Sequence, residues 1–389
     1  MVPVNNDFLP FHVPEIGDEE IQSVVETLRS GWLTTGAKVK QLEENFAKYV
    51  RAAHGVAVNS GTAALHLALE AFGIKERDEV IVPTMTFTAS AEVVLYLKAR
   101  PVLVDCDPVT LNIDADKIEE KITGRTKAIM PVHLAGLPCE MAKIRAIANR
   151  HKLRIVEDAA HALPAVYDGQ MVGAIGDITC FSFYVTKTIT TGEGGMATTN
   201  NPEWADRMRM MSLHGISKDA WNRYSSEGSW FYEVLFPGYK YNMTDIAAAL
   251  GVEQLKKCDR FRNDRRRIAE AYTQGFADYS EIQTPVFDAN LEHAWHLYII
   301  QLELERLSID RNSFIEALKQ KNIGTSVHFI PLHLHPYYRS TFAYTTEDFP
   351  RASAAFKRII SLPIFPKMSN EDVARVITTV RDLVRQHRR

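Results

Sequence analysis

One lysine and one aspartate in the middle of the chain have the types and the setting to do chemistry together. Lys187 lies between two apolar runs, in F-S-F-Y-V-T-K-T-I-T-T-G-E-G-G. A lysine enclosed by protein loses its proton more readily, and the neutral amine is the form that makes a Schiff base. Asp158 ends the strand-like run L-R-I-V-E-D, and the ends of such strands are where open α/β sheets bind ligands. The alternative roles for Asp158 are a helix cap or a salt bridge. Pyridoxal phosphate requires this pair, an amine for its aldehyde and a carboxylate for its pyridinium nitrogen.

Further residues could complete such a site, and each has an ordinary structural alternative. Gly61 and Thr62 in N-S-G-T-A-A-L begin a helix whose free N–H groups could bind a phosphate, or they simply follow a serine cap. Phe87 could stack on a planar ring or pack in the core. His161 could lie beside the cofactor ring or satisfy a buried hydrogen bond. Ser182 could bond the phosphate or its own backbone.

The elements around these residues alternate between apolar strands and amphipathic helices. Strands are predicted near residues 55–60, 78–83, 101–107, 126–133 and 153–158. Continuous apolar strands separated by helices indicate an α/β fold with a mostly parallel sheet covered on both faces. The Lys187 segment is expected to add a hairpin-like pair of strands to that sheet.

The rest of the chain predicts a second, smaller α/β domain. A long helix is expected from Thr244 to about Phe276, and residues 214–241 are predicted to form a long functional or interface loop. Strands at 296–302 and 324–329 and helices near 310–321, 349–359 and 370–386 follow. The predicted boundaries are residues 1–250 for the large domain and 251–389 for the small one.

The composition excludes several classes of protein. The chain has 389 residues, 46% of them hydrophobic, and a net charge of −3. A charge this close to neutral does not favour binding to nucleic acid or to an anionic membrane surface. Its four cysteines form no C-x-x-C pair, so no disulfide frame or metal site is expected. The first residues do not resemble a signal peptide, and a cytoplasmic location is expected. Walker A, G-x-S-x-G and H-E-x-x-H motifs are absent.

The order of five motifs resembles the DegT/DnrJ/EryC1/StrS sugar aminotransferases. The motifs are S-G-T-A-A-L, P-T-M-T-F, E-D-A-A-H, F-S-F-Y-V-T-K-T-I-T-T-G-E-G-G and G-Y-K-Y-N-M-T-D-I. The resemblance covers nearly the whole chain. It implies a fold-type I pyridoxal-phosphate transferase, whose large domain has a mostly parallel seven-stranded sheet and whose C-terminal domain is a smaller α/β unit. Within the family, S-G-W-L-T-T-G and H-A-W-H-L-Y-I-I are most similar to the enzyme that makes UDP-4-amino-4-deoxy-L-arabinose.

The resemblance also implies a role for each site residue. Lys187 would hold pyridoxal 5'-phosphate covalently and carry the proton, and Asp158 would keep the pyridinium nitrogen protonated. Phe87 would stack on the ring, where the arabinose enzyme has a tryptophan, and His161 would lie at the ring's edge. The phosphate would be bound by Gly61, Thr62 and Ser182.

Two further residues are assigned by the resemblance alone. Asn242, in K-Y-N-M-T-D, would reach the phosphate of a neighbouring subunit, which implies a homodimer with shared active sites. The alternative for Asn242 is a cap on the helix that starts near Thr244. His328 would lie in the nucleotide-sugar pocket.

The activity implied by the resemblance is transfer of an amino group from L-glutamate to a keto group of a nucleotide-activated sugar. C4 is the expected position, with C3 as the alternative. A dehydratase using the same cofactor is a rival within the family, but those enzymes have histidine in place of Lys187. A non-catalytic regulatory or binding protein on the same fold is the rival from another class, and it would not need the lysine.

Overall fold

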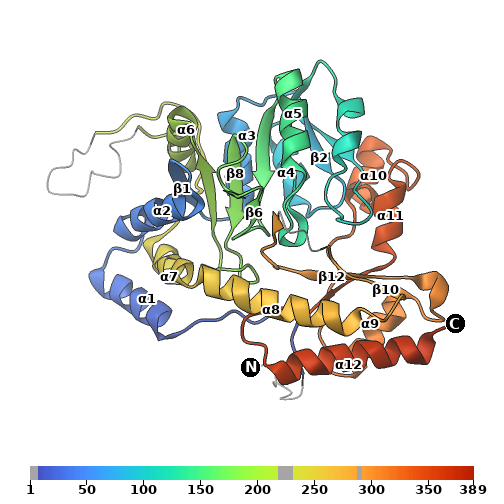
Figure 1. Ribbon diagram of the computed structural model, residues 1–389. Coiled ribbons are helices and arrows are strands. Elements are labelled where there is room, and N and C mark those ends of the chain that lie inside the picture. The colour runs from blue at the N-terminus through green and yellow to red at the C-terminus, as the bar shows by residue number, and fades with distance from the viewer. Residues whose placement is uncertain (1–7, 218–230, 287–290) are drawn as a thin grey trace.

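The computed structural model describes residues 8–217, 231–286 and 291–389 (Figure 1). Its largest sheet has seven strands in the order β1-β9-β8-β5-β4-β2-β3. The strands are β1 (His54–Val58), β2 (Glu79–Pro83), β3 (Arg100–Val104), β4 (Thr126–Ile129), β5 (Arg154–Asp158), β8 (Ile178–Ser182) and β9 (Gly195–Thr199). Only β9 runs antiparallel to its neighbours, so the predicted mostly parallel seven-stranded sheet is confirmed.

Helices cover both faces of this sheet because its strands are apolar on both sides. Val56 and Val58 belong to one core, with α3 (Gly61–Ala71), α4 (Ala89–Tyr96) and α6 (Pro202–Ser212). Ala57 points the other way into a second core, with α2 (Ala37–Val50), α5 (Met141–His151) and α7 (Asp245–Lys256). This alternation along β1 is the two-residue period of a strand, and it sends side chains of one strand into both cores.

A third core lies under a small antiparallel sheet, β10-β12-β13, near the C-terminus. The helices α8 (Cys258–Phe276) and α12 (Asn370–His387) run side by side across it (Figure 1). Leu9, from the start of the described chain, is buried in the same core. Its backbone N–H donates to the carbonyl of Asn322 at 2.8 Å, so the N-terminal segment is joined to the region that follows α9.

The remaining elements are short or peripheral. They are α1 (Asp18–Ser30), β6 (Val166–Tyr167), β7 (Gln170–Met171), β10 (Ile282–Gln283), β11 (Leu291–Glu292), β12 (Tyr298–Leu302), α9 (Arg311–Gln320), α10 (Pro336–Phe342), α11 (Pro350–Phe356) and β13 (Ile359–Leu362). None of the helices in the described residues is long and apolar enough to cross a membrane.

The structure corrects several predicted elements. The long helix is two helices that meet at Lys257, whose side chain is held by Glu20 at 2.8 Å. Residues 324–329 form no strand, because Ser326 makes only an isolated bridge to Ser361 in β13. Between β3 and β4 the chain forms two short 3₁₀ turns, Ala115–Lys117 and Glu119–Lys121. The central part of the predicted 214–241 loop, 218–230, lies outside the described residues, and 231–241 is irregular with isolated bridges.

Candidate active site

A cavity of about 520 Å³ lies where several strands of the large sheet end. The strands β1, β2, β5 and β8 run in the same direction, so the residues that follow them meet at one edge. Eight of the nine predicted site residues line this cavity: Gly61, Thr62, Phe87, Asp158, His161, Ser182, Lys187 and His328. Asn242 does not.

Asp158 is held as a buried carboxylate at the floor of the cavity. Its Oδ2 accepts a hydrogen bond from the Ser90 hydroxyl at 2.7 Å, and its Oδ1 accepts the N–H of Ala160 at 3.1 Å. Burial raises the pKa of Asp158, whereas these two hydrogen bonds and the charge of Lys187 lower it. No helix starts at Asp158, so the helix-cap alternative is wrong.

Lys187 enters the cavity from the loop between β8 and β9, the hairpin predicted from the sequence. Its backbone N–H donates to the carbonyl of Tyr184 at 2.9 Å, which fixes the turn. Burial lowers the pKa of Lys187 from 10.5 to about 8, and the charge of Asp158 opposes that shift. A lysine with this pKa can lose and regain a proton near neutral pH, as a nucleophilic and proton-carrying amine must.

The start of α3 and the end of β8 lie against each other at the wall of the cavity. Ser60 caps α3 by accepting the N–H of Ala63 at 3.1 Å, which leaves the N–H groups of Gly61 and Thr62 without an acceptor inside the helix. A Cβ on Gly61 would lie 2.9 Å from the Cβ of Ser182. Glycine is therefore required for these two backbone segments to approach each other, and the helix N-terminus is free to hold an anion.

Two aromatic side chains form one wall of the cavity. Phe87 follows β2 and is 57% exposed, and its ring centroid lies 5.9 Å from that of Phe329. A phenylalanine left open in a cavity is suited to cover a planar ligand, whereas a core residue would be buried. The alternative of core packing for Phe87 is therefore wrong.

Two histidines on the cavity wall are held in the neutral form. His161 accepts the N–H of Ala135 on Nδ1 at 3.2 Å, so its proton lies on Nε2. Burial and the charge of Lys187 lower the pKa of His161 well below 6.5. His328 bonds the Ser361 hydroxyl through Nδ1 at 2.8 Å, and burial lowers its pKa to about 4.

Asn242 lies beside a different hollow, formed by α2 and β1. Its Nδ2 donates to the Thr35 hydroxyl at 2.8 Å, and its backbone bridges Val58. The cap of α7 is Thr244, whose hydroxyl accepts the N–H of Ala247, so the helix-cap alternative for Asn242 is wrong. Its role in a neighbouring subunit stays a prediction.

Sequence reasoning missed three side chains at the site. Ser90 lies one helical turn beyond Thr86 in the stretch P-T-M-T-F-T-A-S, so its position on the first turn of α4 was a usable signal. His296 and Phe329 come from the C-terminal part of the chain and line the same cavity. Because tertiary packing alone brings them there, no local pattern could have indicated them.

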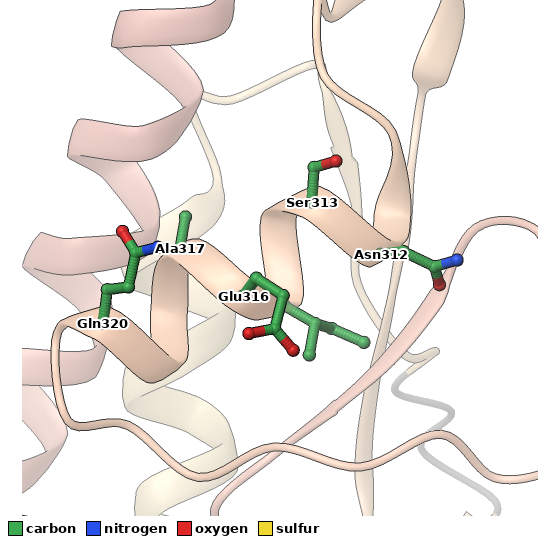
Figure 2. Close-up of a pocket in the computed structure, with 6 residues that line it drawn as sticks. Asn312, Ser313, Glu316, Ala317 and Gln320 are labelled. Atoms are coloured by element: carbon green, nitrogen blue, oxygen red, sulfur yellow. The ribbon is translucent and has the colours of Figure 1, made fainter.

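Another hollow on the surface lacks the features of a reaction site. It follows α9 and is lined by Asn312, Ser313, Glu316 and Gln320 among others. Figure 2 shows these side chains spread along a single helix. They supply no mixture of acid, amine and ring from different elements, so we assign the chemistry to the Lys187 cavity.

Comparison with known proteins decides which family has this arrangement. The model of the DegT/DnrJ/EryC1/StrS aminotransferase family matches residues 14–381. The chain belongs to this family. The resemblance read from the five motifs is confirmed, and so is the fold-type I architecture. The narrower similarity to the UDP-4-amino-4-deoxy-L-arabinose enzyme stays a prediction.

Two full-length relatives and two solved structures show how closely the family matches. The spore coat polysaccharide biosynthesis protein SpsC of Bacillus subtilis is 52% identical over 386 residues, 99% of both chains. An uncharacterized protein of Methanocaldococcus jannaschii is also 52% identical, over 385 residues, 99% of this chain and 100% of that one. A structure from Streptococcus pneumoniae, provisionally assigned as a sugar aminotransferase, is 38% identical with a TM-score of 0.91, covering 97% and 98% of the two chains. The Helicobacter pylori aminotransferase PseC, involved in biosynthesis of pseudoaminic acid, has a TM-score of 0.90 at 28% identity and covers 98% and 100%.

Pyridoxal phosphate is the cofactor of this family, and the pneumococcal protein has been solved in its PLP and PMP forms. The described residues fit this group. The cavity supplies a free helix N-terminus for its phosphate, a buried carboxylate for its ring nitrogen, an open aromatic face and an amine of lowered pKa. Among the described residues, no group of three or more His, Cys, Asp or Glu could hold a metal ion.

Proposed function

We propose that the protein transfers an amino group from L-glutamate to the C4 keto group of a nucleotide-activated sugar. The observation that carries this proposal is Lys187, whose amine has a pKa of about 8 and lies in one cavity with the buried carboxylate of Asp158. The first residue is needed to add and remove a proton, and the second to stabilise charge on a pyridinium ring.

The side chains of this cavity divide the work among them. The bound cofactor supplies an aldehyde that accepts the amino group and a ring that takes up electrons. Asp158, fixed by Ser90, holds the proton on the ring nitrogen. Lys187 anchors the cofactor through its amine and, when released, moves the proton that leaves the donor's Cα. Gly61, Thr62 and Ser182 hold the phosphate.

The second half-reaction would use the same groups in the opposite direction. Lys187 would return the proton that it removed in the first half-reaction, and Phe87, on the wall of the same cavity, would shield the bound ring from solvent. His328 lies in the same cavity as Lys187, and its bond to Ser361 fixes its ring, which suits a residue that contacts the incoming sugar.

An intact lysine distinguishes this activity from its rivals. A dehydratase of this family would have histidine at position 187, and a binding protein would have no use for a desolvated amine there. The partially buried ammonium costs folding free energy, so its presence is better explained by a reaction than by packing.

The relatives support a nucleotide-activated sugar as the acceptor. SpsC is named for biosynthesis of a spore coat polysaccharide and PseC for biosynthesis of pseudoaminic acid. Sugars that enter such pathways are carried as nucleotide derivatives, and such a substrate would enter the cavity at Phe87, whose side chain is exposed to solvent.

We further propose that two copies of the chain share their active sites. Asn242 lies outside its own cofactor cavity, beside a hollow of about 620 Å³ between α2 and β1. Exposed apolar side chains occur close in sequence to residues that line this hollow: Trp32 and Leu33 come just before Thr35, and Phe236 comes shortly before Asn242. A symmetric dimer would cover such side chains and bring Asn242 to the partner's phosphate.

The direct test is a panel of UDP- and dTDP-linked keto-sugars incubated with purified protein, the cofactor and L-glutamate. We expect 2-oxoglutarate and an amino sugar in equal amounts with at least one 4-keto substrate. The Lys187→Ala variant is the control and should give neither. If glutamate releases no 2-oxoglutarate, or if the product has lost a hydroxyl and gained no nitrogen, the proposal is wrong.

A further inference from the structure

A buried histidine–glutamate pair lies directly behind the cofactor-facing residues. His133 and Glu157 are both fully buried. Nε2 of His133 lies 2.9 Å from Oε2 of Glu157, and Nδ1 of His133 accepts the N–H of Cys139 at 3.0 Å. Because Nδ1 is an acceptor, the ring carries its hydrogen on Nε2 and donates it to the carboxylate. Neither residue lines the cavity.

The carboxylate of Glu157 has its other oxygen occupied as well. Oε1 accepts the N–H of Gly176 and the hydroxyl of Thr179, both at 2.7 Å. Burying a carboxylate is costly unless its oxygens accept hydrogen bonds, and here three donors from two segments, the loop 131–139 and the start of β8, supply them. The pair therefore joins the end of β5 to β8 and to the loop 131–139.

That loop holds the two side chains that face the cofactor ring. The backbone of His133 donates to the carbonyl of Asp158 at 3.1 Å, and the backbone of Asp158 donates to the carbonyl of Pro131 at 2.9 Å. Two residues further along, Ala135 donates its N–H to Nδ1 of His161 at 3.2 Å. Ala135 has a φ of +59°, a left-handed conformation that an alanine adopts only when its surroundings hold it there.

The loop also reaches the segment that carries His296. The carbonyl of Ala135 accepts the N–H of Leu297 at 3.1 Å, and the carbonyl of Gly136 accepts the N–H of Ala294 at 3.0 Å. Three sides of the cavity thus meet at the loop 131–139: the strand end with Asp158, the turn with His161 and the C-terminal segment with His296.

We propose that the His133–Glu157 pair is a positioning device that sets the placement of Asp158 and His161 against the cofactor ring. The pair fixes the loop 131–139 to β5, and the loop in turn makes two backbone hydrogen bonds to Asp158 and one to the ring of His161. The inference rests on the pyridoxal-phosphate site and not on the identity of the sugar, so it can fail independently of the proposed function.

The test is Glu157→Gln, which keeps the size of the side chain. In either orientation of the new amide, its nitrogen would face a donor, the Nε2–H of His133 or the N–H of Gly176, so the bonds that hold the pair cannot all be kept. We expect the Kd for pyridoxal phosphate, measured on the cofactor-free protein by fluorescence quenching, to rise roughly 10-fold or more. In the loaded protein, the pH midpoint of the cofactor's absorption should move by about half a unit or more, since the ring's charge partners have moved.

Tyr272→Phe is the matched control. Tyr272 is fully buried and donates its hydroxyl to the carbonyl of Pro363 at 2.8 Å, in the C-terminal core. It should lower the thermal midpoint without changing the Kd or the absorption midpoint. If Glu157→Gln behaves in the same way, with stability alone affected, the pair is merely structural and the proposal is wrong.

Two variants of the partner histidine keep the test decisive if Glu157→Gln does not fold. His133→Asn keeps an acceptor near Nδ1 for Cys139 but loses the donor to Glu157, and should reproduce the change in Kd and absorption midpoint. His133→Gln restores a donor near the Nε2 position and should recover most of the cofactor affinity. Equal cofactor affinity in these two variants would overturn the proposal.

Discussion

Replacing Lys187 by methionine should make the cofactor-free protein more stable at neutral pH, although it removes the reactive group. The pKa of Lys187 is lowered from 10.5 to about 8 by burial. Methionine keeps an apolar stem of similar length and removes the charge. At pH 7 the unfolded lysine is protonated without cost, whereas the folded one holds its proton in a desolvated cavity.

The magnitude follows from linkage between protonation and folding. A shift of about 2.5 units, at about 1.36 kcal/mol per unit, corresponds to about 3.4 kcal/mol of folding free energy. Because the folded pKa lies below the unfolded one, this penalty is fully present below pH 8 and fades as the pH rises toward 10.5. It is about 3.3 kcal/mol at pH 7 and about 1.4 kcal/mol at pH 9.5. Loss of the lysine's attraction to Asp158 reduces the gain, so we expect about 1–3 kcal/mol at pH 7.

The assay is urea unfolding of the cofactor-free protein at pH 7 and pH 9.5, at one fixed protein concentration. The control is Lys257→Met. Lys257 is paired with Glu20 at 2.8 Å, and the carboxylates of Glu20 and Glu19 raise its pKa against the effect of desolvation. Its removal leaves a buried carboxylate unpaired and should destabilise the protein. If Lys187→Met is less stable than the parent at pH 7, the claim that burial lowers the pKa of Lys187 is refuted. The claim is also refuted if the difference in unfolding free energy between the two proteins does not shrink at pH 9.5.

The remaining predictions concern turnover and the shared site. Asp158→Asn should keep its fold and lose most of its rate, roughly 100-fold or more, because the ring nitrogen would no longer be held protonated. Circular dichroism measures the fold and steady-state kinetics the rate, and a variant that keeps its rate and loses only thermal stability would contradict this role of Asp158. Lys187→Ala and Asn242→Ala chains, each inactive alone, should recover part of the parental rate when unfolded and refolded together, since one site of each mixed dimer has both residues intact. A mixture no more active than its two parents would contradict the dimer with shared sites.

The sequence by itself determined the sheet and the chemical groups at its edge. Strands such as β1 and β2 are short apolar runs, and their two-sided burial follows from composition alone. Asp158, Ser182 and Gly61 lie at strand ends or helix starts, which local pattern can locate, and the family motifs assigned their roles. Lys187 could be singled out because an amine between buried strands has few purposes other than chemistry.

Tertiary structure alone decided what surrounds those groups. Ser90 donates to Asp158 across 68 positions of the chain, and His296 reaches the cavity from the C-terminal part. The break between α7 and α8 at Lys257 depends on Glu20, more than 200 residues earlier in the sequence. Strand β13 was missed because a run of four residues shows no period until its partner β12 is known.

The position of Asn242 shows the same limit most clearly. Its type and place before α7 allowed a helix cap, and only the folded chain shows that Thr244 is the cap and that Asn242 faces the hollow between α2 and β1. The hydrogen bond between His133 and Glu157 likewise cannot be predicted from local sequence, since 24 positions separate the two residues. Local propensity acts over a few residues, whereas the hydrogen bonds that place a catalytic group depend on packing between distant segments, and packing exists only in the folded chain.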